Sequence, residues 1–251
     1  MKFSVCTDAL FGGMNTADAI QKCAALGFEA IEFWVWSSKD MKAVKEAADA
    51  AQIKIAGFCT KNMVLTDPSE RNAYLEGLSE SIEVAKAAGA GILISQVGPD
   101  TGLPRQEQYE SIIEGLWAAA PLLKGTGITL AIEPLNLLYD HAGYFLSSSS
   151  EGFKIIKEVG CANIKILFDI YHQQITEGNL IQNITENIDL IGHFHVAGNP
   201  GRHEPFIGEI NYKEVFAAAD KAGYKGYAGL EYWTSENVEE SLKKCLELYE
   251  G

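Results

Sequence analysis

The stretch from Thr129 to Asp169 decides the fold. It opens with the run TLAIE (129–133), continues through EGFKIIKEV (151–159) and closes with KILFD (165–169). The two outer runs have the length and apolar composition of buried strands, and the middle run repeats apolar residues with the period of a helix. A strand, a helix and a second strand in this order are typical of a parallel sheet.

The same unit recurs along the whole chain. Strands are predicted at residues 3–6, 30–33, 55–58, 92–96, 129–133, 165–169, 190–196 and 227–232. Helices are predicted from residue 16 to a stop at Gly27 and over residues 41–52, 68–88, 106–123, 151–159, 180–188, 212–222 and 238–249. Eight such units in 251 residues predict an α/β fold of the (β/α)8 TIM-barrel type, as a single domain over residues 1–251.

A doubly wound nucleotide-binding sheet is the alternative for alternating strands and helices. That fold requires a glycine-rich fingerprint after its first strand, and the sequence FGGM (11–14) does not have the required spacing. No P-loop motif occurs in the sequence either. The closed barrel is therefore the favoured architecture.

The charge of the chain disfavours two classes of partner. Acidic residues outnumber basic ones by 34 to 20, which gives a net charge of −14. A nucleic-acid partner requires Lys and Arg against its phosphates, and an anionic membrane surface repels an acidic chain. We expect neither nucleic acid nor a membrane as a partner.

Cysteine usage and the N-terminal residues indicate the compartment. The five cysteines are dispersed and form no CxxC pair, which is typical of reduced thiols in a cytoplasmic protein. Residues Met1–Asp8 lack the long apolar core of a signal peptide. No apolar stretch reaches the roughly 20 residues that span a bilayer. We therefore expect a cytoplasmic protein.

Polar residues interrupt the apolar runs where the last four strands end. They are Glu133 in AIEPLN, Asp169 in LFDIYH, His195 in GHFHVAG and Glu231 in GLEYW. Catalytic residues of such barrels lie at the carboxyl ends of the strands, and strands five to eight are neighbours around the ring. We expect these four side chains to converge on one point.

The types of these four residues predict a divalent metal site. Three carboxylates brought together repel one another unless a cation lies among them. Three carboxylate oxygens and one imidazole nitrogen are suitable ligands for Mn²⁺, Mg²⁺ or Co²⁺. They differ from the thiolate-rich ligand sets that are typical of zinc. We predict Glu133, Asp169, His195 and Glu231 as the metal ligands.

Two groups near the strand ends admit more than one interpretation. His193 lies two residues deeper than His195 on the same strand face, and we interpret it as filling the barrel or supporting a ligand and not as a ligand itself. Trp34 and Trp36 follow the second strand, where they either line a substrate pocket or pack against other aromatic residues.

Longer motifs extend these strand ends. They are EPLN (133–136) with DHAGYFL (140–146), FDIYHQQ (168–174), and GH (192–193) with NPGRHEP (199–205) and GEINY (208–212). At these residues the chain resembles, over its whole length, the xylose-isomerase-like superfamily of metal-dependent barrels. Within that superfamily it is most similar to the hydroxypyruvate isomerase group.

The resemblance implies that Glu133 and Glu231 are the catalytic pair as well as metal ligands. Asp169 and His195 would complete the coordination of the ion. The chemistry of the residues agrees with this, because a ketone and a neighbouring hydroxyl can chelate one divalent ion while carboxylates move protons through an enediolate. For hydroxypyruvate the product would be tartronate semialdehyde.

The resemblance also implies that His172 and Arg202 contact the substrate, a small hydroxy-oxo acid. Arg202 would hold the substrate carboxylate in a bidentate pair. The alternative for Arg202 is an ion pair with Glu204 or Glu209 that orders the loop. The oligomeric state is not readable from the sequence, although homo-oligomers are common among barrels of this kind and one is possible here.

Other reactions of the superfamily stay open. Hydroxypyruvate isomerases often have Gln where this chain has His195, whereas ketose 3-epimerases have His there. The epimerases carry a further Glu six residues after the first catalytic Glu, and this chain has Tyr139 at that position. A ketose 3-epimerase acting on free sugars, a 2-oxo-tetronate isomerase and an inosose-type dehydratase are the alternatives. A multi-metal nuclease is disfavoured by the five histidines and the net charge of −14.

Overall fold

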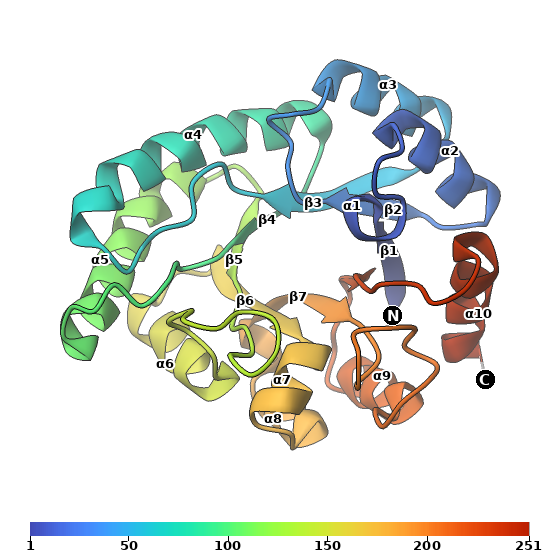
Figure 1. Cartoon of the computed structure of the whole chain (residues 1–251). Helices are drawn as coiled ribbons and strands as arrows, with labels where there is room; N and C mark the ends of the chain where they lie inside the picture. The colour runs from blue at the N-terminus through green and yellow to red at the C-terminus, as the bar shows by residue number, and fades with distance from the viewer. Residues whose placement is uncertain (251) are drawn as a thin grey trace.

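The computed structural model describes residues 1–250, which form a closed ring of eight parallel strands surrounded by helices (Figure 1). The strands pair in chain order, and the first pairs with the last to close the ring. The predicted (β/α)8 barrel is confirmed. Gly251, the last residue of the predicted domain, lies outside the described residues.

Strands and helices alternate along the chain, and the longest connections follow β5 and β7. The strands are β1 (Lys2–Cys6), β2 (Ala30–Phe33), β3 (Lys54–Cys59), β4 (Ile92–Ser95), β5 (Thr129–Ile132), β6 (Ile164–Asp169), β7 (Ile191–Val196) and β8 (Tyr227–Leu230). The helices are α1 (Thr7–Leu10), α2 (Thr16–Ala25), α3 (Met41–Ala50), α4 (Arg71–Ala88), α5 (Arg105–Leu123), α6 (Ser149–Val159), α7 (Ile170–Thr176), α8 (Leu180–Glu186), α9 (Tyr212–Lys221) and α10 (Val238–Glu250). Two 3₁₀ turns cover Pro68–Glu70 and Ile188–Leu190.

The helix boundaries have identifiable chemical causes. Asn15 caps α2, because its side chain accepts a hydrogen bond from the Ala17 N–H. α4 ends at Gly89, whose φ of 73° places it in the left-handed region that glycine adopts without strain. Gln52, predicted as helical, instead follows α3 with a φ of 55°.

The helix α7 was not expected from the sequence, although it carries His172. Its seven residues are too few to establish a helical period. Asp169 starts it, because the side chain of this last β6 residue accepts a hydrogen bond from the His172 N–H. Asp169 is thus both the last residue of β6 and the N-cap of α7.

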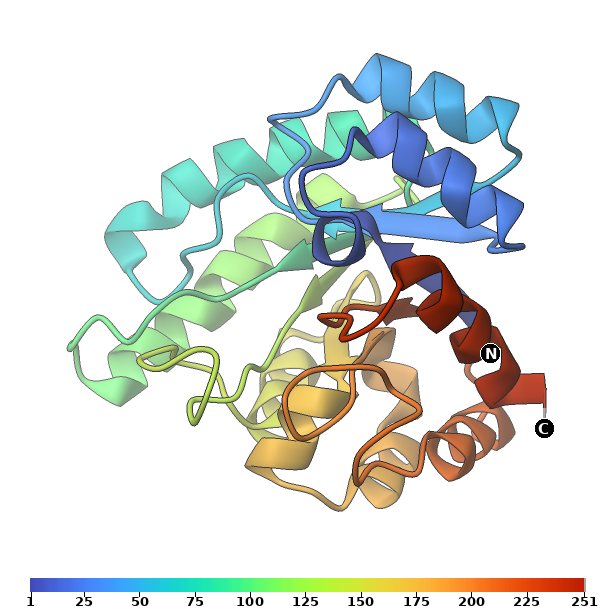
Figure 2. The ribbon, with the colours of Figure 1, turned by 45° about the vertical axis from the view of Figure 1, so that its right-hand side comes forward.

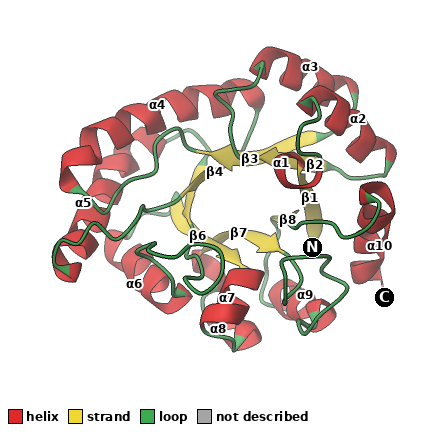
Figure 3. Ribbon diagram, in the orientation of Figure 1, coloured by secondary structure: helices red, strands yellow, loops and turns green. Residues whose placement is uncertain are grey.

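The inside of the barrel is built in layers beneath the predicted metal ligands. Side chains two residues apart on a strand share a face, so the residues below the four ligands are Ala131, Leu167, His193 and Gly229. Ala131 and Leu167 pack with Ile94 in a small apolar cluster. Figure 3 shows the ring of strands in yellow, with the helices in red around its outside. The layer beneath the predicted ligands is therefore apolar on β5 and β6, with Ala131 and Leu167. On β7 and β8 it consists of His193 and Gly229, which has no side chain.

The ring closes where the first and last elements of the chain meet. Figure 2 shows β1, in dark blue, beside α10, in red. Met1, Phe3 and Leu246 of α10 line one pocket at this seam. Among the helices of residues 1–250, none combines the length and the apolar composition that a membrane span requires.

We predict that Gly57→Ala destabilises the barrel and that Gly91→Ala does not. A Cβ at Gly57 of β3 would lie 2.6 Å from the carbonyl oxygen of Ile92 and 2.8 Å from its Cβ, whereas nothing lies within 4 Å of a Cβ at Gly91. Overpacking of this kind costs about 1–3 kcal/mol, which lowers Tm by about 2–4 °C per kcal/mol in a chain of this size. Thermal unfolding of both variants measures the difference, and equal Tm values would contradict it.

Candidate metal centre

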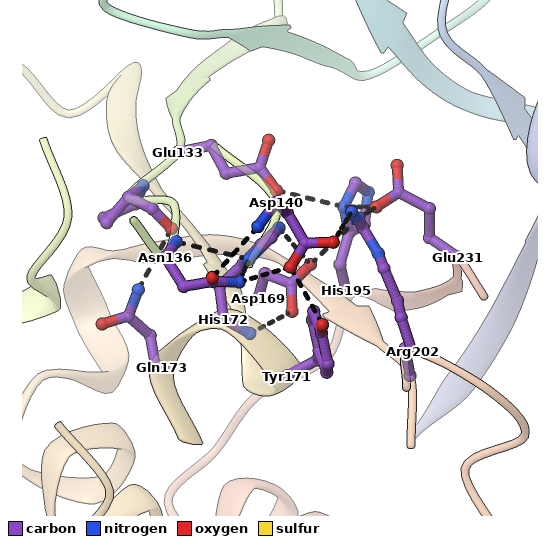
Figure 4. A network of polar contacts seen from close by, with 12 residues as sticks. Glu133, Asn136, Asp140, Asp169, Tyr171, His172, Gln173, His195, Arg202 and Glu231 are labelled. Carbon is purple, nitrogen blue, oxygen red and sulfur yellow. Dashed lines mark hydrogen bonds and ion pairs between the residues drawn. The ribbon is translucent and has the colours of Figure 1, made fainter. Parts of the chain in front are cut away.

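Four buried side chains meet at the carboxyl end of the barrel. Glu133 follows β5, Asp169 ends β6, His195 lies in β7 and Glu231 follows β8. One candidate ligand atom from each of the four lies within 4.8 Å of the others (Figure 4). The structure therefore brings together all four residues that the sequence predicts as metal ligands.

The geometry of this cluster fits a divalent ion. Nδ1 of His195 lies 3.4 Å from a carboxylate oxygen of Glu133 and 3.4 Å from one of Glu231. Neither this nitrogen nor Oδ2 of Asp169 has a hydrogen-bond partner, although both are buried. Oxygen ligands bind divalent ions at about 2.0–2.6 Å, so ligands on opposite sides of an ion are about 4–5 Å apart. The spacing, the donor types and the unpartnered atoms all agree with a site that can bind a metal.

The charges of the cluster shift the pKa values of its members. Burial acts to lower the pKa of His195, but the charges of Glu231 and Glu32 outweigh it and raise the pKa well above its ordinary value. Burial acts to raise the pKa of Glu231, yet His195 and Arg202 lower it far below its usual range. Burial raises the pKa of Asp169 against the opposing charge of Arg202. The carboxylates of the cluster thus depend on the nearby positive charge of His195 and Arg202.

His172 is positioned in the first turn of α7 by the loop after β5. Nδ1 of His172 lies 2.6 Å from Nδ2 of Asn136, and Oδ1 of Asn136 accepts from the Tyr139 N–H at 3.0 Å. Because the Asn136 oxygen is occupied, its NH₂ group faces the ring and Nδ1 of His172 is the acceptor. Burial and the charge of Arg202 lower the pKa of His172 to about 3, so the ring is neutral. Its Nε2 lies 3.6 Å from Oδ2 of Asp169, too far for a hydrogen bond, and has no partner.

Arg202 reaches into the cluster from the loop after β7. Its Nη2 forms an ion pair with Oε2 of Glu231 and lies 3.8 Å from Oδ2 of Asp169. The guanidinium also lies over the ring of Tyr171, 5.5 Å from its centroid. Arg202 has a φ of 56°, a left-handed conformation that non-glycine residues rarely adopt. The loop thus directs this side chain inward.

The alternative interpretation of Arg202 is contradicted. Glu204 accepts hydrogen bonds from Thr234 and Ser235, and Glu209 accepts from Asn199 and Gln174. Neither carboxylate pairs with Arg202. The positive charge of Arg202 is therefore committed to the cluster and not to ordering its own loop.

A cavity of about 360 Å³ opens directly above the cluster. Glu133, His195, Glu231 and Arg202 form part of its wall, and Trp34 forms another part. Trp34 also donates a hydrogen bond from Nε1 to Oε1 of Glu231 at 2.5 Å. Both interpretations of Trp34 are therefore confirmed. Its side chain lines the cavity, and its ring packs edge-on against that of Trp233, with the ring centroids 5.8 Å apart. The hydrogen bond to Glu231 was not expected from the sequence.

Sequence reasoning also missed Glu32, which lies in β2 directly beneath the cluster. Its carboxylate oxygens are 2.9 Å from Nε2 of His195 and 2.8 Å from Nε2 of His193. The interpretation of His193 as a supporting residue agrees with this position. A signal for Glu32 was present in AIEF (30–33), because a single carboxylate in a buried strand requires a partner.

Comparison with known proteins agrees with the barrel and its site. Residues 20–249 match the family model described as a xylose isomerase-like TIM barrel. The chain belongs to this family. It is 31% identical to the hydroxypyruvate isomerase of Escherichia coli strain K12 over 255 aligned residues, which cover 97% of each chain.

Two further comparisons bear on the family. A segment covering 48% of the chain is 46% identical to the 2-oxo-tetronate isomerase of Cupriavidus necator, over 46% of that protein. A crystal structure described as an AP endonuclease of family 2 from Brucella melitensis superposes with a TM-score of 0.93 at 25% identity, over 98% of both chains. The relatives named as isomerases support an enzyme of the isomerase type.

We predict that divalent metal stabilises the chelator-treated chain. An ion that binds only the folded state at about 100 times its Kd adds about 2.7 kcal/mol, equivalent to a rise in Tm of about 5–10 °C. The measurement is Tm with and without Mn²⁺. Asp169→Asn is the matched control, because Asn retains the cap of α7 but removes one ligand charge, so its Tm should rise much less. A Tm of the unmodified chain that ignores Mn²⁺ would contradict the metal site.

Proposed function

We propose that this chain is a metal-dependent isomerase of a small hydroxy-oxo acid, with the conversion of hydroxypyruvate to tartronate semialdehyde as its reaction. The observation that carries this proposal is the presence, in one cavity, of two glutamates on either side of a candidate metal site and an arginine beside them. Similarity to a named hydroxypyruvate isomerase over nearly the full chain supports the same substrate class.

Glu133, Asp169, His195 and Glu231 would hold the ion, which we expect to be Mn²⁺, Mg²⁺ or Co²⁺. When bound, such an ion polarises the substrate carbonyl and stabilises the negative charge of an enediolate. Buried carboxylate oxygens and one imidazole nitrogen are suitable donors for these ions.

Glu133 and Glu231 move the protons of the reaction. Isomerisation of hydroxypyruvate removes a proton from C3, delivers a proton to C2 and shifts the hydroxyl proton from O3 to O2. One glutamate takes the C3 proton as a general base, and the same or the facing glutamate returns a proton to C2. Both carboxylates line the cavity, and each has an oxygen 3.4 Å from Nδ1 of His195, so they face one reaction centre.

Arg202 and His172 bind and orient the substrate. Arg202 offers a planar guanidinium beside the cluster, which suits a bidentate pair with the substrate carboxylate. Its charge is retained, since the surrounding carboxylates outweigh burial and raise its pKa above the ordinary value. His172 is fully buried and lines neither hollow, but Nε2 of its neutral ring has no hydrogen-bond partner and is free to donate to a substrate oxygen that reaches the cluster.

A 2-oxo-tetronate is the second candidate substrate. A further hollow of about 530 Å³ adjoins the first cavity, and Lys61, Gln96 and His141 line both. This extension leaves room for a substrate with a longer carbon chain than hydroxypyruvate. Tyr139, at the position of the additional epimerase glutamate, is 72% exposed and lines neither cavity, so a ketose 3-epimerase is less favoured.

The substrate assignment is tested by a panel of compounds assayed with Mn²⁺. The panel contains hydroxypyruvate, 2-oxo-tetronates, fructose, psicose and inosose. We expect the highest kcat/KM with one of the two acids, accompanied by exchange of substrate protons with solvent. Turnover of the neutral sugars alone would contradict the assignment.

We predict that Glu133→Gln and Glu231→Gln each lower kcat by about 10²–10⁴-fold, the size of a general acid–base contribution. Gln retains an oxygen for the metal but cannot accept the proton. The assay is run at saturating Mn²⁺, with Glu83→Gln as the control because Glu83 pairs only with Lys86 on the surface. A near-normal rate in either site variant would overturn the two-glutamate mechanism.

We predict that Arg202→Ala lowers kcat/KM for hydroxypyruvate by about 10- to 100-fold, from the loss of a charged hydrogen-bonding pair. The decrease for a neutral ketose should be much smaller, because that substrate has no carboxylate to bind. Arg105→Ala is the matched control, since Arg105 pairs with Glu151 at the surface. Equal losses for both substrates would show that Arg202 does not recognise the carboxylate.

A further inference from the structure

Glu32 is a buried carboxylate that the proposed proton transfers do not use. It lies in the middle of β2 and is only 1% exposed. One of its oxygens, Oε1, lies 2.9 Å from Nε2 of His195. The other, Oε2, lies 2.8 Å from Nε2 of His193 and accepts a hydrogen bond from the Ser4 hydroxyl at 2.7 Å. Oε2 is therefore held by hydrogen-bonding partners from β1 and β7, and Oε1 lies beside the His195 ring.

The position of this carboxylate depends on a glycine in the neighbouring strand. Gly229 of β8 is in register with Ser4 of β1 on one side and with His195 of β7 on the other. A Cβ at Gly229 would lie 2.6 Å from Cδ and Oε2 of Glu32, and closer still to Oε1. A larger residue at 229 would displace the carboxylate, so the barrel provides a space that only glycine leaves open.

The contact with Glu32 determines which nitrogen of His195 faces the cluster. Nε2 lies on the Glu32 side of the ring, 2.9 Å from Oε1, and Nδ1 lies 3.4 Å from one oxygen each of Glu133 and Glu231. Neither ring nitrogen is aligned for a hydrogen bond, so the assignment depends on the positions of the two nitrogens. A neutral ring whose Nε2–H is next to a carboxylate has its lone pair on Nδ1. Metal-binding histidines usually donate their other ring N–H to a carboxylate or carbonyl, which fixes the ring and strengthens the ligand.

We propose that Glu32 is a positioning residue of the metal centre, which holds the His195 ring with Nδ1 as its ligand atom. His193 and Ser4 hold the Glu32 carboxylate in turn, and Gly229 leaves room for it. The inference rests on the proposed function, because it requires a metal ion at the cluster of Glu133, Asp169, His195 and Glu231.

A second metal ion among Glu32, His193 and His195 is the competing interpretation, since their candidate ligand atoms also lie within 4.8 Å of one another. The contacts disfavour it. The carboxylate oxygens already lie 2.8 and 2.9 Å from the two ring nitrogens, so an ion between them would require these groups to separate. The same three residues are better explained as support for one ion above them.

The first test is calorimetric titration of the chelator-treated chain with Mn²⁺. The unmodified chain should bind one ion. Glu32→Gln retains the side-chain shape but removes the charge and replaces one acceptor oxygen with an NH₂ donor, so binding should weaken by about 10- to 100-fold. Glu29→Gln is the matched control and should bind normally, since Glu29 pairs with Lys2 at the surface of the adjoining loop.

Each result of this titration has a distinct meaning. Two ions bound per chain would establish the second site and overturn the positioning role. Equal affinity in the unmodified chain and in Glu32→Gln would overturn the inference but leave the metal centre intact. Failure of the unmodified chain to bind Mn²⁺ would overturn the proposed metal centre and, with it, this role for Glu32.

The second test separates ring positioning from a general loss of structure. In the Mg²⁺-loaded chain, nitrogen NMR of the His195 ring should show a proton on Nε2 and none on Nδ1, with the signal assigned by its absence in His195→Gln. Gly229→Ala leaves Glu32 and all four ligands in the sequence but removes the space for the carboxylate, and it should weaken Mn²⁺ binding in the same direction as Glu32→Gln. Circular dichroism and Tm verify folding at the titration temperature. An unchanged ring signal in a folded Glu32→Gln variant would overturn the proposal.

Discussion

The mutual repulsion of three buried carboxylates is the constraint on which the rest of the site depends. Glu133, Asp169 and Glu231 lie within reach of one another at the end of the barrel, where water does not screen their charges. His195 and Arg202 supply the positive charge that balances them. Arg202 contacts the same carboxylate oxygens that an ion would approach, so in the proposed function the ion and the arginine compete for these oxygens. If the carboxylates held an ion in the proposed function, the guanidinium of Arg202 would be available for the acid group of a substrate.

The barrel holds these charges in place because its strands are fixed on both sides. Asp169 of β6 is in register with His195 of β7, which is in register with Gly229 of β8. Beneath Glu133 and Asp169 the interior is apolar, with Ala131 and Leu167. Beneath His195 and Glu231 it is polar and contains Glu32. Glu133 and Asp169 thus lie above an apolar layer, whereas His195 and Glu231 lie above a layer that contains the hydrogen-bonded pair of His193 and Glu32.

The barrel was predictable because its elements repeat with a strong period. The runs ending at Glu133 and Asp169 read as buried strands, and the mouth of a barrel is where such strands end, so the four predicted ligands followed from their positions alone. The helix α7 was not predictable in this way, because it begins at a strand residue and lasts only seven residues. A short element contains too few turns for its period to appear in the sequence.

Glu32 and the hydrogen bond of Trp34 were missed for a different reason. Strands of a barrel are buried on both faces, so the pattern around Glu32 does not tell whether its side chain points to the interior or to the helices. The partners of Glu32 lie 28 and more than 160 positions away in the chain. The indole of Trp34 likewise reaches Glu231, 197 positions away. Contacts of this range depend on the closure of the ring, which no local pattern contains.

Asp169 illustrates how side-chain length is constrained when one residue belongs to two elements. Glu133 and Glu231 follow their strands and cap no helix, whereas Asp169 also caps α7 with its own Oδ1. Asp is among the preferred residues at a helix N-cap, and the longer Glu is not. We therefore expect β6 to end in Asp and not in Glu. Oδ1 of Asp169 accepts the hydrogen bond that caps α7, and its other oxygen lies in the cluster. The position of His172 in the first turn of α7 is thereby tied to that carboxylate, through the hydrogen bond from the His172 N–H.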